Sequence, residues 1–145
     1  MPTVSICDDA ADLRLLMSLT LENEGYEVAT HDGGIRTLEG LRTSRSLPDL
    51  LLLDVQMPEM DGWSVLAEVR GDPRFDGLRV VMCTVKFSQS DLARAWEMGC
   101  DGYLTKPFDL DELCATVAAV TSRTNCQNQA FRDQQRAIFA GELLT

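Results

Sequence analysis

The residues of this chain whose chemistry stands out are acidic, and one of them follows the most apolar stretch. Asp54 comes directly after four consecutive leucines at residues 50–53. Such a run predicts a short strand buried on both faces of a parallel sheet, and ligands of these sheets bind at the carboxyl ends of the strands. Pro58 and Gly62 then indicate a loop before the next helix. Asp54 is therefore a candidate for chemistry, although an aspartate that only caps the loop would give the same local pattern.

Other polar side chains follow apolar runs in the same way. These are Asp8 and Asp9 after residues 4–7, Thr84 after residues 79–83 and Lys106 after residues 102–105. Carboxylates held close together resist ionisation unless a cation lies among them, and Mg²⁺ is the divalent ion that prefers such oxygen ligands. A lysine and a threonine hydroxyl would add positive charge and a hydrogen-bond donor. The set describes a pocket for a small dianion beside a carboxylate nucleophile, and phosphoryl transfer to Asp54 fits it.

Strand-like and helix-like patterns alternate along the chain, and this alternation predicts how the polar groups meet. The expected strands cover residues 4–7, 26–30, 50–53, 79–83 and 102–105, and the expected helices lie near residues 13–21, 35–41, 63–69, 91–98 and 110–122. Alternation with short loops indicates right-handed crossovers and a parallel sheet covered on both faces. We expect an α/β fold, a (βα)5 flavodoxin-like doubly wound sheet of strand order 2-1-3-4-5. In that order the strands that carry the polar groups are consecutive neighbours.

Local signals place the helix faces and ends. The first helix is expected to bury one face with Leu13, Leu16, Met17, Thr20 and Leu21, and the second with Ile35, Leu38 and Leu41. Gly25 is a plausible left-handed cap, and Ser88 or Ser90 is the N-cap of the fourth helix. His31 is expected at the surface in a turn. Trp96 suits either the core or an interaction surface.

Composition excludes several classes of protein. The chain has 145 residues, 45% of them hydrophobic and 25% charged, with a formal net charge of -10. This length fits one domain, and the negative charge argues against direct binding to nucleic acid. No apolar run approaches the ~20 residues of a membrane span, and no secretory signal is visible. Five cysteines without a CxxC pair favour reduced thiols, so we expect a cytoplasmic protein that does not bind membranes.

The expected domain covers residues 1–123, and residues 124–145 form a tail outside the alternation. The tail is rich in glutamine, with Phe131, Ile138 and Phe139 at near-helical spacing. It is interpreted as an extra helix packed on the domain, a dimer contact or the start of a linker, with a frayed end as the alternative.

Taken as a set, these motifs resemble the receiver domain of two-component response regulators, over roughly residues 3 to 122. The shared motifs are Asp8 and Asp9 after the first strand, the leucine run with Asp54, Met57, Pro58, Asp61 and Gly62, Thr84 after the fourth strand, and residues 99–108 with Lys106 and Pro107. The resemblance implies that Asp54 accepts a phosphoryl group. It also implies that Mg²⁺ is held by Asp9 directly, by Asp8 largely through water, by Asp54, and by the backbone carbonyl of Gln56.

The resemblance further implies a switch. Lys106 would pair with the phosphoryl oxygens, and its peptide bond to Pro107 would be cis. Thr84 would move towards the phosphoryl group and Tyr103 would follow it inward, which remodels the surface of the fourth helix, fifth strand and fifth helix. The expected partners are a histidine kinase or phosphotransfer protein and an unidentified downstream protein, with a homodimer as a further option. Catalysis would be limited to Mg²⁺-dependent self-phosphorylation and autodephosphorylation.

Some positions depart from the family pattern and keep alternatives open. Val85 stands where many members have a smaller side chain and would narrow access to Asp54, while Gln56 and Lys86 occupy variable positions beside the site. One alternative is therefore a pseudo-receiver that acts only as an interaction scaffold. A second is an aspartyl-phosphate phosphatase of the haloacid-dehalogenase type. That enzyme needs a second aspartate at position 56, where this chain has glutamine. Cys7 and Cys83 are expected to be buried, inert thiols.

Overall fold

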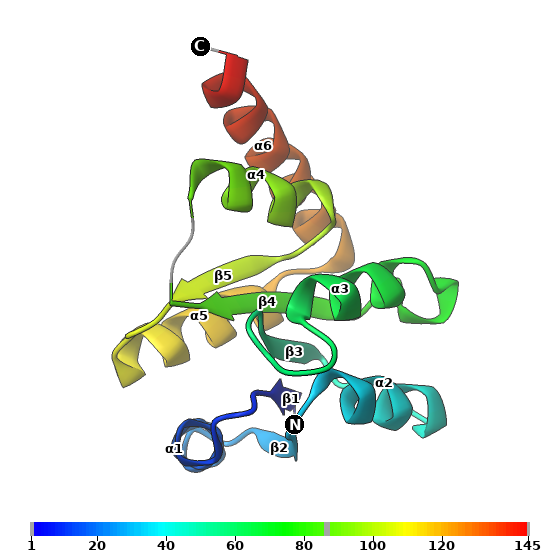
Figure 1. The fold of residues 1–145 in the computed structure, drawn as a ribbon, viewed down its shortest axis with the longest axis vertical. Coiled ribbons are helices and arrows are strands. Elements are labelled where there is room, and N and C mark those ends of the chain that lie inside the picture. Colours follow the sequence, from blue (N-terminus) through cyan, green and yellow to red (C-terminus); the bar gives the residue numbers. More distant parts are fainter. Residues whose placement is uncertain (1, 86–87, 145) are drawn as a thin grey trace.

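The computed structural model of the chain describes residues 2–85 and 88–144, and in these residues one sheet is covered by helices on both faces (Figure 1). The strands are β1 (Thr3–Cys7), β2 (Glu27–His31), β3 (Leu50–Asp54), β4 (Arg79–Thr84) and β5 (Gly102–Thr105). The helices are α1 (Ala11–Asn23), α2 (Gly34–Thr43), α3 (Gly62–Arg70), the 3₁₀ turn η1 (Pro73–Phe75), α4 (Gln89–Glu97), α5 (Leu110–Ser122) and α6 (Asn125–Leu144). Lys86 lies outside the described residues.

The sheet has the strand order β2-β1-β3-β4-β5, with every neighbouring pair parallel. This confirms the expected (βα)5 flavodoxin-like fold. The register aligns Cys7 with Leu53, Asp54 with Cys83, and Thr84 with Thr105. The carboxyl ends of β1, β3, β4 and β5 therefore meet along one edge of the sheet, where the polar groups follow.

The leucine run of β3 holds the two halves of the core together. Leu50 and Leu52 point into the half beneath α1 and α5, and Leu51 and Leu53 into the half beneath α2, α3 and α4. None of the four is more than 1% exposed. Burying one such side chain contributes about 1.5–3 kcal/mol, so β3 is anchored firmly and Asp54 is held at its end.

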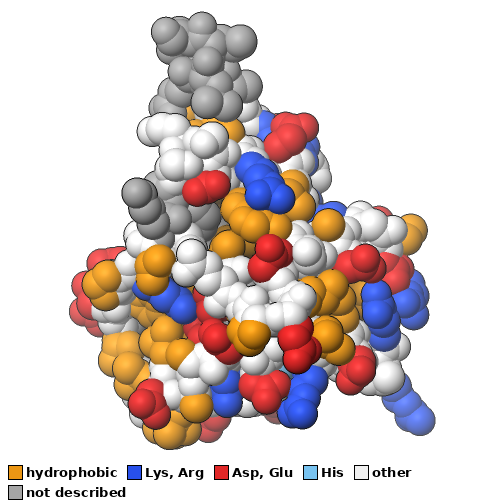
Figure 2. Space-filling view, viewed as in Figure 1, with side chains coloured by type: hydrophobic (Ala, Val, Ile, Leu, Met, Phe, Trp, Pro, Cys, Tyr) orange, Lys and Arg blue, Asp and Glu red, His pale blue; other side chains and the backbone are white. Residues whose placement is uncertain are grey.

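Two predicted helix faces were partly wrong. Leu16 of α1 and Ile35 of α2 are each 47% exposed. The buried residues of α1 are Met17, Ser18 and Leu21, and those of α2 are Gly34, Thr37, Leu38 and Leu41. The physical reason is that α1 lies beside the largely exposed edge strand β2, so only a narrow stripe of α1 is covered. Figure 2 shows hydrophobic side chains at the lower left, where α1 lies, among acidic and basic ones.

The helix ends follow their capping residues. Ser88, rather than Ser90, caps α4, and its hydroxyl and the carboxylate of Asp91 form a capping box, so α4 begins two residues earlier than predicted. Gly25 has φ +97°, as expected for a left-handed cap. His31 was expected in a turn, but it ends β2 and is only partly exposed. Its burial lowers its pKa, although the charge of Asp32 opposes this.

The tail after residue 124 forms helix α6, which packs against α4 (Figure 1). Phe139 and Asn128 of α6 are buried, while Ile138 is 43% exposed. Trp96 of α4 belongs to the core and is only 2% exposed. In residues 2–85 and 88–144, no helix combines the length and apolar composition that crossing a bilayer requires.

Candidate functional site

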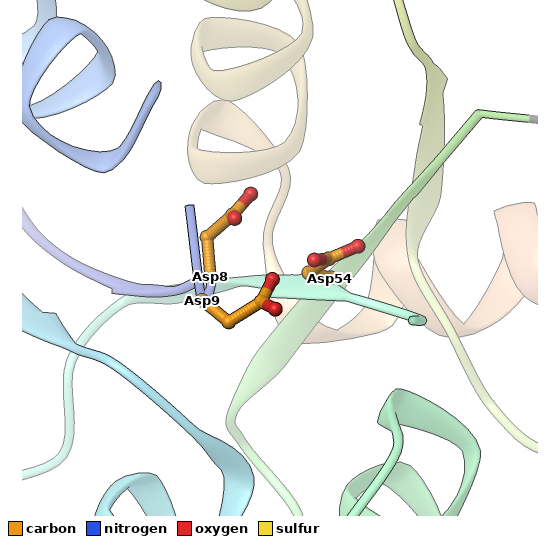
Figure 3. A group of neighbouring side chains, drawn as sticks. All are labelled: Asp8, Asp9 and Asp54. Carbon is orange, nitrogen blue, oxygen red and sulfur yellow. The ribbon is translucent and has the colours of Figure 1, made fainter. Parts of the chain in front are cut away.

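Three carboxylates converge at the carboxyl edge of the sheet. Asp8 and Asp9 follow β1 and Asp54 ends β3, and one ligand oxygen from each lies within 4.8 Å of the others (Figure 3). Asp8 is 1% exposed and Asp54 is 5% exposed, whereas Asp9 faces solvent. The parallel pairing of β1 with β3 brings these residues together, although they are far apart in the sequence.

Lys106 completes the cluster from the end of β5. Its Nζ donates to Oδ2 of Asp8 at 2.9 Å and lies 3.3 Å from Oδ1 of Asp54. Its backbone N–H donates to the carbonyl of Thr84, at 2.6 Å. The peptide bond to Pro107 is cis, as the resemblance implied. The structure thus brings together the basic and acidic groups that were singled out from the sequence.

The electrostatics of the cluster leave it short of positive charge. Burial raises the pKa of Asp54 to about 6, and the charge of Asp8 adds to this, while Lys106 and the backbone N–H of Gln56 oppose it. For Lys106, burial acts to lower the pKa, but the hydrogen bond to Asp8 and the charge of Asp54 outweigh burial and raise it. Among the described residues, three carboxylates face one ammonium group, so a divalent cation would restore the balance.

The donor set fits Mg²⁺. The three carboxylates supply hard oxygen ligands, and the exposed Asp9 gives a hydrated ion access to the two buried ones. Mg²⁺ retains several waters, so few protein ligands are needed. The role of the Gln56 carbonyl as a further ligand stays a prediction, because the structure shows only that the Gln56 N–H donates to Asp54.

The two expected switch residues lie on neighbouring strands beside this cluster. Thr84 is the last residue of β4 and is 4% exposed. Tyr103 of β5 is 38% exposed, and its ring meets the edge of Trp96 with 6.3 Å between ring centroids. Thr84 pairs with Thr105, two residues beyond Tyr103 on β5. The movement of both residues stays a prediction.

The remaining positions near the site have clear structural explanations. Val85 is 57% exposed, so its side chain projects outward from the end of β4. Cys7 and Cys83 are buried, and burial raises the pKa of the Cys7 thiol to about 11 and that of Cys83 to about 12. Both thiols therefore stay protonated at neutral pH, as inert core residues do.

Two residues with structural importance were given no role in the sequence reading. A Cβ atom at Gly62 would lie 2.4 Å from the backbone oxygen of Asp54, so only glycine lets the loop close over the site. The Asp-Gly pair at residues 61–62 was the available signal, but it indicated only a turn. Asp101 is fully buried and accepts hydrogen bonds from Arg70, Asn128 and Arg132. Its local sequence carries no signal for these distant partners.

Comparison with known proteins connects this geometry to a family. The family model described as response regulator receiver domain matches residues 4–118. The regulator RpaA of Synechocystis, described as a DNA-binding dual master transcriptional regulator, is 36% identical over 93% of this chain and 55% of its own length. The DNA-binding response regulator MtrA of Mycobacterium tuberculosis is 35% identical over 84% of this chain and 51% of its own length. The chain spans about half the length of these curated relatives.

Solved structures show the same fold. The chemotaxis response regulator CheY4 of Vibrio cholerae superposes with a TM-score of 0.77 and 31% identity, over 83% of this chain and 98% of that one. The receiver domain of the Francisella response regulator 1452 also has a TM-score of 0.77, with 27% identity over 85% of this chain and 98% of that one.

Proposed function

Because this chain belongs to the response regulator receiver domain family, we propose that it is a signalling switch activated when Asp54 accepts a phosphoryl group. The donor is the phosphohistidine of a histidine kinase or of a phosphotransfer protein. The observation that carries this proposal is the position of Asp54, a buried carboxylate between two further carboxylates and the ammonium group of Lys106.

The chain's own groups supply most of the chemistry. Oδ1 of Asp54 accepts from Lys106 and from the N–H of Gln56, which leaves Oδ2 to attack phosphorus. An electron pair of Oδ2 forms the new O–P bond, and the P–N bond to the donor histidine breaks with its electrons remaining on nitrogen. Lys106 and the Thr84 hydroxyl then hold phosphoryl oxygens. Asp8, Asp9, Asp54 and the Gln56 carbonyl would hold Mg²⁺, which would supply charge neutralisation for the transferred group.

The phosphoryl group then shifts the population of two arrangements of Thr84 and Tyr103. It adds charge and acceptor oxygens that are satisfied only when Thr84 turns towards them. Tyr103 follows inward and changes the α4–β5–α5 surface, which binds the downstream partner. This partner is a protein or a second copy of the chain, since the net charge of -10 disfavours direct contact with nucleic acid or anionic membranes.

We propose that this activity takes place in the cytoplasm and that the protein does not turn over an external substrate. All five cysteines are free, as suits a reducing compartment. The site acts on its own Asp54 through self-phosphorylation and autodephosphorylation. A haloacid-dehalogenase-type phosphatase is disfavoured because the side chain of Gln56 cannot serve as the second carboxylate. The exposed amide of Gln56 cannot donate a proton to a leaving group as a carboxylic acid does.

The test is phosphorylation by acetyl phosphate with Mg²⁺, followed by intact-protein mass spectrometry. The wild type should gain the mass of one phosphoryl group in a form that hydroxylamine removes, as it does from an acyl phosphate. Asp54→Asn should gain none. Asp12→Asn is the matched control, because Asp12 is an exposed aspartate of α1 outside the cluster. Label retained in Asp54→Asn would show that another residue is the acceptor.

The scaffold alternative rests on Val85, which follows Thr84 where many family members have a smaller side chain, although its side chain is exposed. A pseudo-receiver would lack the metal site, so a Mg²⁺ titration separates the two. We expect Mg²⁺ to change the emission of Trp63, the second residue of α3, and this change to be lost in Asp9→Ala. A wild type that shows no response to millimolar Mg²⁺ and no phosphoryl mass would support the scaffold.

A further inference from the structure

Helix α6 is attached to the end of α4 by an arginine. Nε of Arg136 donates to the carbonyl of Trp96 at 2.9 Å, and its Nη2 donates to the carbonyl of Glu97 at 3.3 Å. The last carbonyls of a helix lack partners within the helix and carry partial negative charge. Arg136 therefore acts as a C-terminal cap of α4 that comes from a different helix.

A second attachment runs through the fully buried carboxylate of Asp101, between α4 and β5. Oδ1 of Asp101 accepts from the side chains of Asn128 and Arg132, both on α6. Oδ2 accepts from Arg70 at 3.0 Å and from the N–H of Val80 at 2.8 Å. One carboxylate thus ties α6 to α3 and β4, and the docking of α6 depends on the loop that leads into β5.

A third contact links α6 to the switch residue of β5. The ring of Phe131 on α6 meets the ring of Trp96 with 5.6 Å between centroids, and Trp96 in turn meets Tyr103 at 6.3 Å. Both contacts are edge-to-face, the geometry that aromatic pairs prefer. Trp96 is therefore the single ring between Tyr103 and α6 in this row of three.

The rings also border an open surface pocket. This pocket of about 360 Å³ lies against Trp96, Tyr103 and Phe131, with Thr116 of α5 and Gln135 of α6 in its walls. The indole Nε1 of Trp96 is buried and has no hydrogen-bond partner within the described residues. A buried unpaired donor is unfavourable, so this position of Trp96 carries a free-energy cost.

We propose that α6 is an autoinhibitory helix whose docking is coupled to phosphorylation of Asp54. In the unphosphorylated protein α6 covers the α4 side of the α4–β5–α5 surface (Figure 1), and the row Tyr103, Trp96 and Phe131 carries the coupling. Inward movement of Tyr103 removes one of the two ring contacts of Trp96 described above. This loosens the packing of Phe131 against Trp96 and releases α6. This inference rests on the proposed function, because the phosphoryl group drives the movement of Tyr103.

The first experiment measures hydrogen exchange of residues 125–139 by mass spectrometry, before and after treatment with acetyl phosphate and Mg²⁺. We expect exchange to speed up about fivefold or more, the lower end of typical allosteric coupling. Treated Asp54→Asn should remain at the slow rate. If the intact mass shows a phosphoryl group but α6 exchange is unchanged, the autoinhibitory role is overturned and the proposed function stands. If no phosphoryl group is taken up, both are overturned.

Coupling between two sites is reciprocal, so docked α6 must disfavour the phosphorylated state by the same free energy by which phosphorylation disfavours docked α6. The second experiment tests this reciprocity. Phe131→Ala should speed α6 exchange without phosphorylation and lower the half-saturating concentration of beryllofluoride, a phosphoryl mimic, by about fivefold. Ile138→Ala, on the exposed side of the same helix, should change neither. An unchanged beryllofluoride affinity in a Phe131→Ala protein whose α6 exchanges faster would refute the coupling.

Discussion

Nζ of Lys106 lies 2.9 Å from Oδ2 of Asp8, although the two residues are 98 positions apart in the sequence. They follow β5 and β1, and these strands are separated in the sheet by β3 and β4. The side chain of Lys106 reaches Asp8 at the carboxyl edge, and both partners are well buried, at 15% and 1% exposure. The ammonium group is therefore held over the acidic cluster before any phosphoryl group arrives.

Replacement of this lysine tests its electrostatic role. Lys106→Met keeps much of the apolar stem but removes the charge, so the carboxylates of Asp8 and Asp54 lose the one ion pair that each makes among the described residues. We expect at least a tenfold slower phosphorylation by acetyl phosphate, or about 1.4 kcal/mol of transition-state free energy. Arg36→Met is the control, because its ion pair with Asp32 is exposed and contributes little. Equal rates in the two variants would exclude a role for the Lys106 charge.

The raised pKa of Asp54 predicts a pH dependence of stability in the absence of divalent ions. Its pKa is about 6 in the folded protein, through burial and then the charge of Asp8, against 3.8 ordinarily. The folded state therefore binds the proton more tightly, and ionisation of Asp54 destabilises the fold as pH rises from about 4 through 6. Asp54→Asn should be more stable than the wild type at pH 7 by on the order of 2 kcal/mol.

Urea unfolding of both proteins between pH 4 and 7, with a chelator present, measures this effect. The wild-type free energy of unfolding should fall relative to that of Asp54→Asn as the pH increases, and the two curves should approach each other near pH 4. A constant difference across this range would contradict the titration of Asp54 in this window.

The close approach of Gly62 to the site predicts a steric effect. A Cβ atom there would lie 2.4 Å from the Asp54 carbonyl oxygen and 2.8 Å from Cα of Val55, and both are backbone atoms that cannot turn aside. Gly62→Ala should destabilise the protein by about 1–3 kcal/mol and slow phosphorylation by displacing the loop. Gly77→Ala is the matched control, since no atom lies within 4 Å of its Cβ position. Similar unfolding midpoints for both variants would refute the close contact.

Local pattern was enough to predict much of the fold, because hydrophobic periodicity and capping residues act over a few positions. The leucine run of β3 and the glycine cap at Gly25 are examples. The burial of Leu16 and Ile35 was predicted wrongly because an apolar side chain is covered only where another element lies over it. The position of His31 at the end of β2 was missed for a related reason, since strand pairing with Cys7 extends β2 beyond its own local signal.

By itself, the sequence determined the alternation of strands and helices, and hence which carboxylates and which lysine stand at strand ends. These features depend on short-range order along the chain. Only the tertiary structure decided the burial of Asp54 and Asp8, the reach of Lys106 to both, and the docking of α6 on Asp101 and Trp96. Burial, ion pairing and the packing of rings are properties of atoms that meet in space, and their free energies depend on neighbours that no local window of sequence contains.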